Sequence, residues 1–147
     1  MSFTIGPVAD TAVLYAGIQQ FYARQMQLLD AGRAEAWADT FTEDAVFEAN
    51  AHPEPVHGRR DIREAAAMAA TQRAERGVQV RHWIGMLDVH PGEDGVVRVV
   101  SYALIINTPA GGGSQLHLST TCEDVLVRDD AGEWQVSTRR VTRDDLR

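Results

Sequence analysis

The hydrophobic pattern of this chain changes period once, at Gly77, and that change limits the folds that it can adopt. Before Gly77, apolar residues recur every three to four positions, as in the series Leu14, Ile18, Phe21 and Leu28. This spacing is typical of amphipathic helices. After Gly77 the period is two, which is typical of strands. Helices followed by long strands indicate an α+β domain rather than alternating strand–helix units.

The expected elements follow from this pattern and from the turn residues between its segments. We expect helices over residues 11–29, 33–40 and 59–76, with a strand over 45–50 and a proline-containing loop over 52–58. Residues 1–10 are interpreted as a short arm. Four longer strands are expected over 78–89, 96–108, 115–128 and 133–141. Turns rich in Gly, Pro and Asp separate these strands, so an antiparallel meander is predicted.

The length of the last strands predicts the shape of the sheet. Strands of about ten residues or more exceed the usual length, and we expect them to curl, with the three helices covering the concave side. The prediction is therefore one domain over residues 1–147. It is a cone-shaped α+β barrel, in which three N-terminal helices pack on a strongly curved, mostly antiparallel sheet.

Charge and composition exclude several classes of partner. The chain has 147 residues, of which 21 are acidic and 14 basic, so its formal net charge is −7. An acidic domain lacks the positive surface that nucleic acids and anionic membranes require. No apolar run approaches the roughly 20 residues of a membrane span, and no secretory signal is visible. With one cysteine and no metal-ligand or phosphate-loop spacing, we expect a cytoplasmic protein with no metal site and no cofactor.

Polar residues among apolar neighbours are the first candidates for a functional site. Gln25 interrupts the apolar stripe of the first helix, where its amide either bonds within the core or faces a ligand. His82 shares a strand face with Val80, Ile84 and Met86. A lone histidine there is more often a core residue, but an imidazole paired with a carboxylate serves as a general acid or base.

The strand over 115–128 has no purely apolar face. Asp124 shares one face with Thr120 and Cys122. It is either an inward carboxylate of a site or the partner of Arg139 or Arg140 on the next strand, and we favour the ion pair. His117 falls on the opposite face, unless a β-bulge reverses the alternation before it.

The strand over 96–108 is apolar on both faces, which predicts that both are covered. One face would line the interior of the cone, and we place Tyr102 there as a hydroxyl donor. The other face would need a partner, so a homodimer through the sheet is predicted.

A set of short motifs, in a fixed order, carries a family resemblance. The motifs are L-D-A-G at 29–32, F-x-x-D-A-x-F at 41–47, H-G-R-x-x-I at 57–62, R-H-W at 81–83 and E-D-x-L-x-R-x-x-x-G-x-W-x-V-x-x-R at 123–139. With these motifs the chain resembles the SnoaL-like polyketide cyclase branch of the nuclear transport factor 2-like superfamily. Ketosteroid isomerases and scytalone dehydratases belong to the same superfamily.

The resemblance implies an enzyme of secondary metabolism and a set of site residues. It implies that His82 is catalytic and that Asp30, at the end of the first helix, is its carboxylate partner; Asp124 is the second candidate for that role. The implied chemistry is cofactor-free cyclisation, isomerisation or dehydration of a hydrophobic polyketide-type intermediate folded in an apolar cavity. The candidate substrate-binding residues are Gln25, Tyr22, Trp37, Phe47, Tyr102, Thr120 and Cys122.

Two other functions fit the same fold, because a fold does not determine an activity. One is a non-catalytic module, either a ligand-binding protein or a subunit of the kind that supports ring-hydroxylating dioxygenases. The other is a dehydratase of the scytalone dehydratase type. The R-H-W motif at 81–83 resembles segments of both.

Overall fold

Three α-helices precede most of the sheet. The structure is a computed structural model that describes residues 7–147, with side chains from Asp10 onward. The helices are α1 (Pro7–Asp30), α2 (Ala34–Ala38) and α3 (Arg59–Glu75), and a short 3₁₀ helix, η1 (Asp144–Leu146), ends the chain. Helix α1 begins at Pro7, so the predicted arm is wrong for residues 7–10, and residues 1–6 lie outside the described residues. Proline suits the first helical position, where no intrahelical N–H is needed.

Six strands form a single sheet. They are β1 (Phe41–Ala49), β2 (Val56–His57), β3 (Val78–Pro91), β4 (Val97–Pro109), β5 (Gln115–Arg128) and β6 (Trp134–Arg143). Their order in the sheet is β2-β1-β6-β5-β4-β3. Strands β3 to β6 form the predicted antiparallel meander, and β1 lies parallel to β6.

Two boundaries near the start of the sheet differ from the prediction. Strand β1 begins at Phe41, four residues before the expected strand, and β2 lies inside the segment that we expected to be a loop. Val56 and His57 pair antiparallel with Phe47 and Val46. Two residues directly after a proline were too few to show an alternating pattern.

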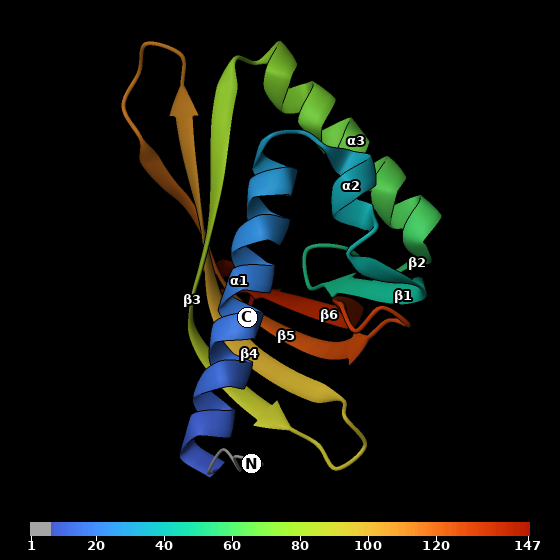
Figure 1. Cartoon of the computed structure of the whole chain (residues 1–147). Helices are drawn as coiled ribbons and strands as arrows, with labels where there is room; N and C mark the ends of the chain where they lie inside the picture. The colour runs from blue at the N-terminus through green and yellow to red at the C-terminus, as the bar shows by residue number, and fades with distance from the viewer. Residues whose placement is uncertain (1–6) are drawn as a thin grey trace.

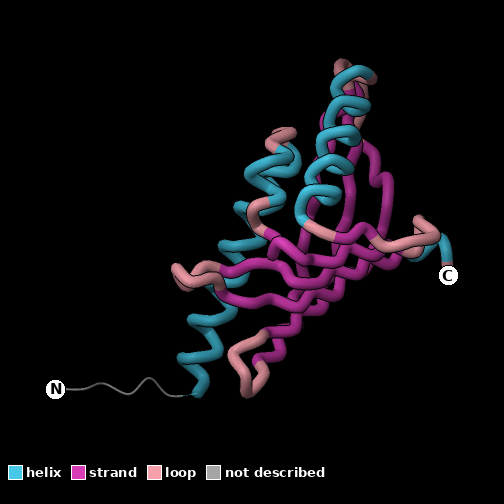
Figure 2. The backbone as a smooth tube through the Cα atoms, turned by 90° about the vertical axis from the view of Figure 1, so that its right-hand side faces the viewer, coloured by secondary structure: helices cyan, strands magenta, loops and turns pink. Residues whose placement is uncertain are grey.

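The helices lie on one side of the curved sheet. Helix α1 runs along the concave face, and α2 and α3 lie above the same face (Figure 1). Seen from the side, the strands bend around this helical layer (Figure 2). The α+β cone is therefore confirmed, although the sheet is open, with β2 and β3 at its edges, and does not close into a barrel. Within residues 7–147, no helix has both the length and the apolarity needed to cross a membrane.

A β-bulge in β3 reverses its faces. The register between β3 and β4 shifts between Gly85 and Asp88, and Met86 has a φ of 53°. The side chain of Met86 is 78% exposed, whereas Leu87 packs against the core. Placing Met86 on the same inner face as His82 was therefore wrong, because the extra residue of a bulge breaks the alternation.

A second bulge lies at the start of β5. Ile105 pairs with Leu118 and Ile106 pairs with Leu116, so His117 has no partner residue on β4. Leu116 is exposed. His117 lines a pocket on the helical side of the sheet, together with His82. Simple alternation along β5 would place His117 on the same face as Thr121. The bulge instead places His117 on the opposite face.

The core fills the part of the cone between α1, α2 and the central strands. Its fully or almost fully buried apolar side chains include Ile18, Phe21, Tyr22, Trp37, Phe41, Leu126 and Val136. Most of the interior is therefore occupied by protein side chains, and the space for a ligand lies toward one end of the sheet.

Candidate active site

The end of α1 sets the position of Asp30. Gly32 follows two residues later with a φ of 75°, a conformation that glycine adopts without strain. The N–H of Gly32 donates to the carbonyl of Leu29, and the N–H of Arg33 donates to that of Leu28, both at 3.0 Å. This is a Schellman-type ending, which stops the helix immediately beyond Asp30. Asp30 is thus the last helical residue and projects toward β3.

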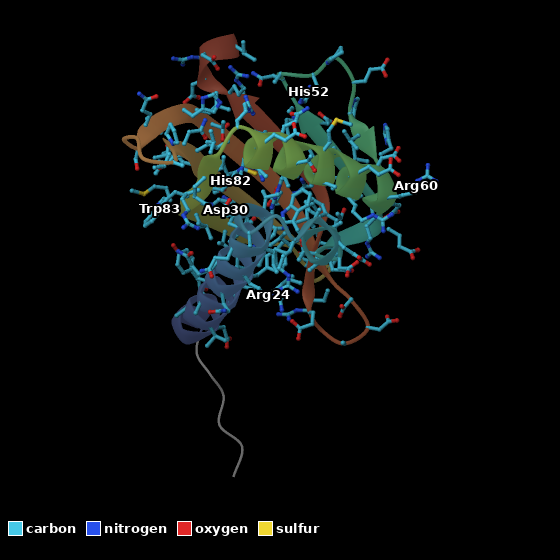
Figure 3. The ribbon with its side chains drawn as sticks, turned by 90° about the horizontal axis from the view of Figure 1, so that it is seen from above. Arg24, Asp30, His52, Arg60, His82 and Trp83 are labelled. Atoms are coloured by element: carbon cyan, nitrogen blue, oxygen red, sulfur yellow. The ribbon has the colours of Figure 1, made fainter. Side chains whose placement is uncertain are left out.

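Asp30 and His82 form a hydrogen-bonded pair. The Nδ1 atom of His82 lies 2.6 Å from Oδ1 of Asp30. The backbone N–H of His82 also donates to the carboxylate, at 3.0 Å to Oδ2 and 3.3 Å to Oδ1. The pair is mostly buried, with side-chain exposures of 7% for Asp30 and 18% for His82. Figure 3 shows the two residues side by side, while Trp83 points to the outside.

This geometry determines which ring nitrogen of His82 is available. A carboxylate only accepts hydrogen bonds, so Nδ1 carries the proton that is donated to Asp30. In the neutral imidazole, Nε2 then holds the free electron pair. Nε2 has no hydrogen-bond partner among the described residues. The arrangement is that of an oriented general base.

His82 lines a pocket of about 250 Å³ between the C-terminal half of α3 and the strands β3, β4 and β5. The pocket has an apolar part formed by Ala69, Val78, Val80 and Ile105, and a polar part formed by Gln72, Arg73, Arg76, His82, Asn107 and His117. Small alanine side chains on α3 leave room between this helix and the sheet. The volume is near the lower limit of small-molecule clefts, roughly 300 Å³, and suits a ligand of one or two rings.

Asn107 and His117 are pocket residues that our candidate set lacks. The Oδ1 atom of Asn107 is buried without a hydrogen-bond partner among the described residues. A buried polar atom in that state requires a donor from water or from a ligand. His117 reaches the pocket only because of the bulge in β5. The sequence signal for His117 was weak, since bulges leave no fixed pattern.

Asp124 lies elsewhere, in a buried network at the centre of the cone. Arg139 makes two hydrogen bonds to its carboxylate, from Nε to Oδ1 and from Nη2 to Oδ2, each 2.9 Å long. The hydroxyl of Tyr22 donates to Oδ2 at 2.6 Å. Both ionic side chains are almost fully buried. Asp124 thus forms the ion pair that we favoured, and it does not contact His82.

Gln25 belongs to the same network. Its Oε1 accepts a hydrogen bond from Nη2 of Arg139 at 2.7 Å, and its Nε2 donates to Oγ1 of Thr40 at 2.8 Å. Burial alone would lower the pKa of Arg139, but the adjacent Asp124 carboxylate raises it, and the net shift is upward. Arg139 therefore stays charged, and Gln25 is a hydrogen-bonded core amide.

The other expected substrate-binding residues do not line the pocket of His82. Thr120 donates to the carbonyl of Ala103 at 2.8 Å, and the ring of Trp37 packs against that of Phe41 at 4.8 Å. Phe47 is partly buried and Cys122 is buried in the core. The placement of Tyr102 on the cavity side was wrong, because its side chain is 57% exposed on the face away from the helices.

The thiol of Cys122 gives the fold a pH dependence. Burial raises the pKa of this thiol, and the nearby Asp124 carboxylate raises it further. Above about pH 8.5, where a free thiol ionises, the unfolded chain releases this proton and the folded chain keeps it. The free energy of unfolding is therefore expected to fall as the pH rises, by at most about 1.4 kcal/mol per pH unit from this group.

Urea unfolding at about pH 7 and about pH 9.5 tests this expectation, with Cys122→Ala as the control. The chain has no lysine, and the Tyr22 hydroxyl, whose pKa burial also raises, ionises only at still higher pH. The alanine variant should show a smaller loss of stability over this range. Equal losses in both proteins would assign the pH dependence to other groups.

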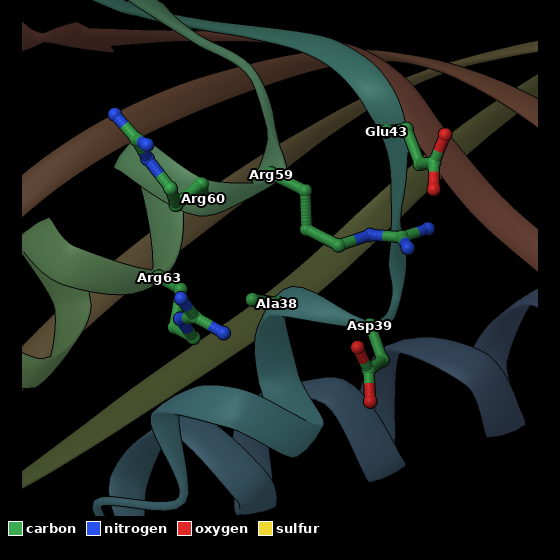
Figure 4. Close-up of a pocket in the computed structure, with 6 residues that line it drawn as sticks. All are labelled: Ala38, Asp39, Glu43, Arg59, Arg60 and Arg63. Carbon is green, nitrogen blue, oxygen red and sulfur yellow. The ribbon is translucent and has the colours of Figure 1, made fainter.

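A second hollow, of about 290 Å³, lies at the start of α3. Figure 4 shows Arg59 and Arg63 facing it, with Asp39 and Glu43 on its other sides. Arg59 donates through Nε and Nη2 to the carbonyl of Phe41, at 2.9 and 2.6 Å, and so fixes the start of β1. None of the described residues around this hollow is a histidine. Within the described part of the chain, no group of three or more His, Cys, Asp or Glu side chains is placed to hold a metal ion.

Comparison with known proteins places this chain in a family context. The family profile described as "SnoaL-like domain" matches residues 10–140. The solved structure of Aln2 from a Streptomyces species is 32% identical, with a TM-score of 0.85, over 98% of this chain and 96% of that one. ActVI-ORFA from Streptomyces coelicolor is also 32% identical, with a TM-score of 0.83, over 90% of this chain and 96% of that one.

A third similar structure contains a small molecule. It is a protein from Catenulispora acidiphila in complex with S-DNPA, 36% identical with a TM-score of 0.79, over 91% of this chain and 96% of that one. No curated protein matches the sequence.

Proposed function

Because this chain belongs to the SnoaL-like family, we propose that it is a cofactor-free enzyme that removes a proton adjacent to a carbonyl group in a hydrophobic polyketide-type intermediate. The observation that carries the proposal is the hydrogen-bonded Asp30–His82 pair at the pocket between α3 and the sheet. A small-molecule complex of a similar protein supports binding of an organic ligand by this fold.

The proposed mechanism begins at His82. Asp30 holds Nδ1, and Nε2 takes the proton from the carbon next to the carbonyl. The electron pair of the broken C–H bond moves to the carbonyl oxygen and forms an enolate. In an aldol cyclisation the enolate carbon attacks a second carbonyl, a C–C bond forms, and His82 returns its proton to the new alkoxide. Isomerisation and dehydration share the first step.

The enolate oxygen needs a hydrogen-bond donor in the pocket. Gln25, Tyr102 and Thr120 are the hydrogen-bond donors among our candidate substrate-binding residues that could take this role, and none of them lines the pocket. The amide of Asn107 and the imidazole of His117 are in the pocket and take that role in the proposal. The apolar wall of the pocket orients the ring system.

Deuterium exchange tests this function without the natural substrate. The bicyclic ketone 2-tetralone is a suitable probe, since its activated CH₂ group exchanges with D₂O when a base forms the enolate. We expect the protein to accelerate this exchange, as followed by proton NMR. Binding of 2-tetralone without acceleration would favour the ligand-binding alternative and remove the acid–base mechanism.

We also propose that the protein is a homodimer through the face of the sheet away from the helices. Large apolar side chains are exposed there on three neighbouring strands, with exposures of 68% for Trp83, 57% for Tyr102 and 63% for Leu116. A contiguous exposed apolar surface of this kind is typical of an interface.

Sedimentation velocity tests the dimer. We expect the unmodified protein to sediment as a dimer and Trp83→Asp to sediment as a monomer, because the substitution places a carboxylate in the apolar interface. Met68→Asp is the matched control, since Met68 is 65% exposed on α3, away from this face. A monomeric unmodified protein, or a dimeric Trp83→Asp variant, would contradict this arrangement.

A further inference from the structure

The pocket of His82 has a cationic side that the acid–base mechanism does not use. Two arginines of α3, Arg73 and its C-cap residue Arg76, line the pocket on the helical side. His117 and His82 lie on the side of the sheet. None of the described residues that line the pocket is an Asp or a Glu. The chain as a whole has a net charge of −7. The residues that line this pocket are cationic, neutral or titratable bases, so the charge of the pocket is opposite in sign to that of the chain.

Arg73 occupies a position that an apolar residue would normally fill. The side of α3 that faces the sheet carries Ile62, then Ala66, then Ala69 and Ala70 at spacings of three and four residues. One turn further along the helix, the same side carries Arg73. Arg73 is half-buried, whereas its neighbours Gln72 and Ala74 are exposed. A charge on the inner face of a helix requires a partner.

Neither arginine has a carboxylate partner in the described part of the chain. Arg76 donates from Nε to the carbonyl of Gln72 in its own helix, at 3.4 Å, and neither guanidinium forms an ion pair with a described residue. Both arginines suit the helix dipole, since Arg73 lies in the last turn of α3 and Arg76 is its C-cap residue. The dipole does not require either side chain to line the pocket.

The nearby acidic groups are already bound. Asp30 accepts the hydrogen bonds of His82. Asp145 is close enough to His117 for the imidazole to lower its pKa, but its main partner is Arg143, at 2.7 and 3.0 Å. The free guanidinium groups thus face the pocket without an anion, and an arginine fork matches a carboxylate geometrically.

We propose that this pocket binds its substrate as an aromatic carboxylate of one or two fused rings. The carboxylate lies between Arg73 and Arg76, the rings lie against Val80 and Ile105, and the reacting carbon faces His82. This inference rests on the proposed function, which identifies the carbon of the substrate that reacts at His82. It adds the substrate class, which is a carboxylic acid rather than an ester or a neutral ketone. Asn107 accepts a hydrogen bond from a ring hydroxyl.

Fluorescence titration with two matched probes tests the charge requirement. The probes are 3-hydroxy-2-naphthoate and the neutral 3-hydroxy-2-naphthamide, which have the same ring and hydroxyl. We expect the acid to bind about 10- to 100-fold more tightly than the amide. Arg73→Gln should remove most of this preference and leave amide binding unchanged. Arg73→Lys, which keeps the charge but loses the fork, should retain part of it.

Arg63→Gln is the matched control, because Arg63 lies on the same helix but faces the other hollow. Its preference for the acid should equal that of the unmodified protein. Equal binding of acid and amide by the unmodified protein, or an equal loss in Arg63→Gln and Arg73→Gln, would overturn the proposal.

The same titration separates this inference from the proposed function. If the protein prefers the acid but does not accelerate the exchange of 2-tetralone, the carboxylate site stands and the proposed enzymatic function fails. If it accelerates the exchange but binds both naphthyl probes equally, the enzymatic function stands and the carboxylate site fails.

Discussion

Replacing His82 by alanine is expected to lower the rate of 2-tetralone exchange by about 10²- to 10⁴-fold, the usual contribution of a positioned general base. The reason is geometric: Nε2 of His82 is the ring nitrogen that Asp30 leaves free in the pocket. Proton NMR in D₂O measures the loss. His82→Gln provides a second variant of similar size that cannot accept a proton at neutral pH.

Asp30 orients His82, so replacing Asp30 should change which ring nitrogen of His82 carries the proton. Asp30→Asn replaces an acceptor-only carboxylate by an amide, so that Nδ1 of His82 is no longer required to carry the proton. Nitrogen NMR should show the Nδ1-protonated tautomer in the unmodified protein and a mixture in the variant. Exchange should slow and its pH profile should change. For His82 itself, the contradicting result is a His82→Ala variant with full activity and an unchanged pH profile. That result would exclude His82 as the general base and leave only the folding of the substrate by the shape of the pocket.

The second large effect concerns stability. Arg139→Leu is expected to lower the free energy of unfolding by about 3–5 kcal/mol, because it leaves the buried Asp124 carboxylate without its cation. Since domains are stabilised by about 5–15 kcal/mol in total, this loss is large. Urea unfolding at about neutral pH measures it. Gln25 and Tyr22 would retain only part of the network.

Two further variants make this prediction decisive. The exposed Arg140, which pairs with Glu48 at 3.3 Å, is the control, and Arg140→Leu should change stability by about 0–1 kcal/mol. If Arg139→Leu does not fold, the double variant Asp124→Leu/Arg139→Leu should recover soluble protein, because an apolar pair often replaces a buried ion pair without loss. Equal effects of Arg139→Leu and Arg140→Leu would show that the buried pair contributes little.

The sequence predicted the helices, the meander and the cone because long periodic segments report burial directly. It also identified the pairing of Asp30 with His82, although an ideal helix would turn Asp30 away from the stripe of Gln25. The structure shows that α1 is helical through Asp30 and that Asp30 and Gln25 serve different sides of it: Asp30 bonds to His82 on β3, whereas Gln25 bonds to Arg139 in the core. Here the short motif L-D-A-G carried more information than helical geometry.

The pocket was predicted less well than the fold. We placed the site among residues that fill the core, such as Tyr22 and Cys122, because periodicity identifies inward side chains but not which of them touch one another. Tyr102 and Met86 were placed on the wrong side, the latter because bulges reverse the alternation of a strand. Arg73 was not considered, because a charge at one helical position resembles ordinary surface composition.

The bulge at His117 has a consequence for how proteins of this shape diversify. The one unpaired residue keeps Leu116 on the apolar outer face while the adjacent imidazole enters the pocket. Removing His117 would restore regular alternation, leave Leu116 opposite Ile106 on the outer face, and take the imidazole out of the pocket. An insertion or deletion of one codon, rather than a substitution, is therefore enough to add or remove an ionisable group at the pocket while the paired residues of β4 and β5 keep their partners.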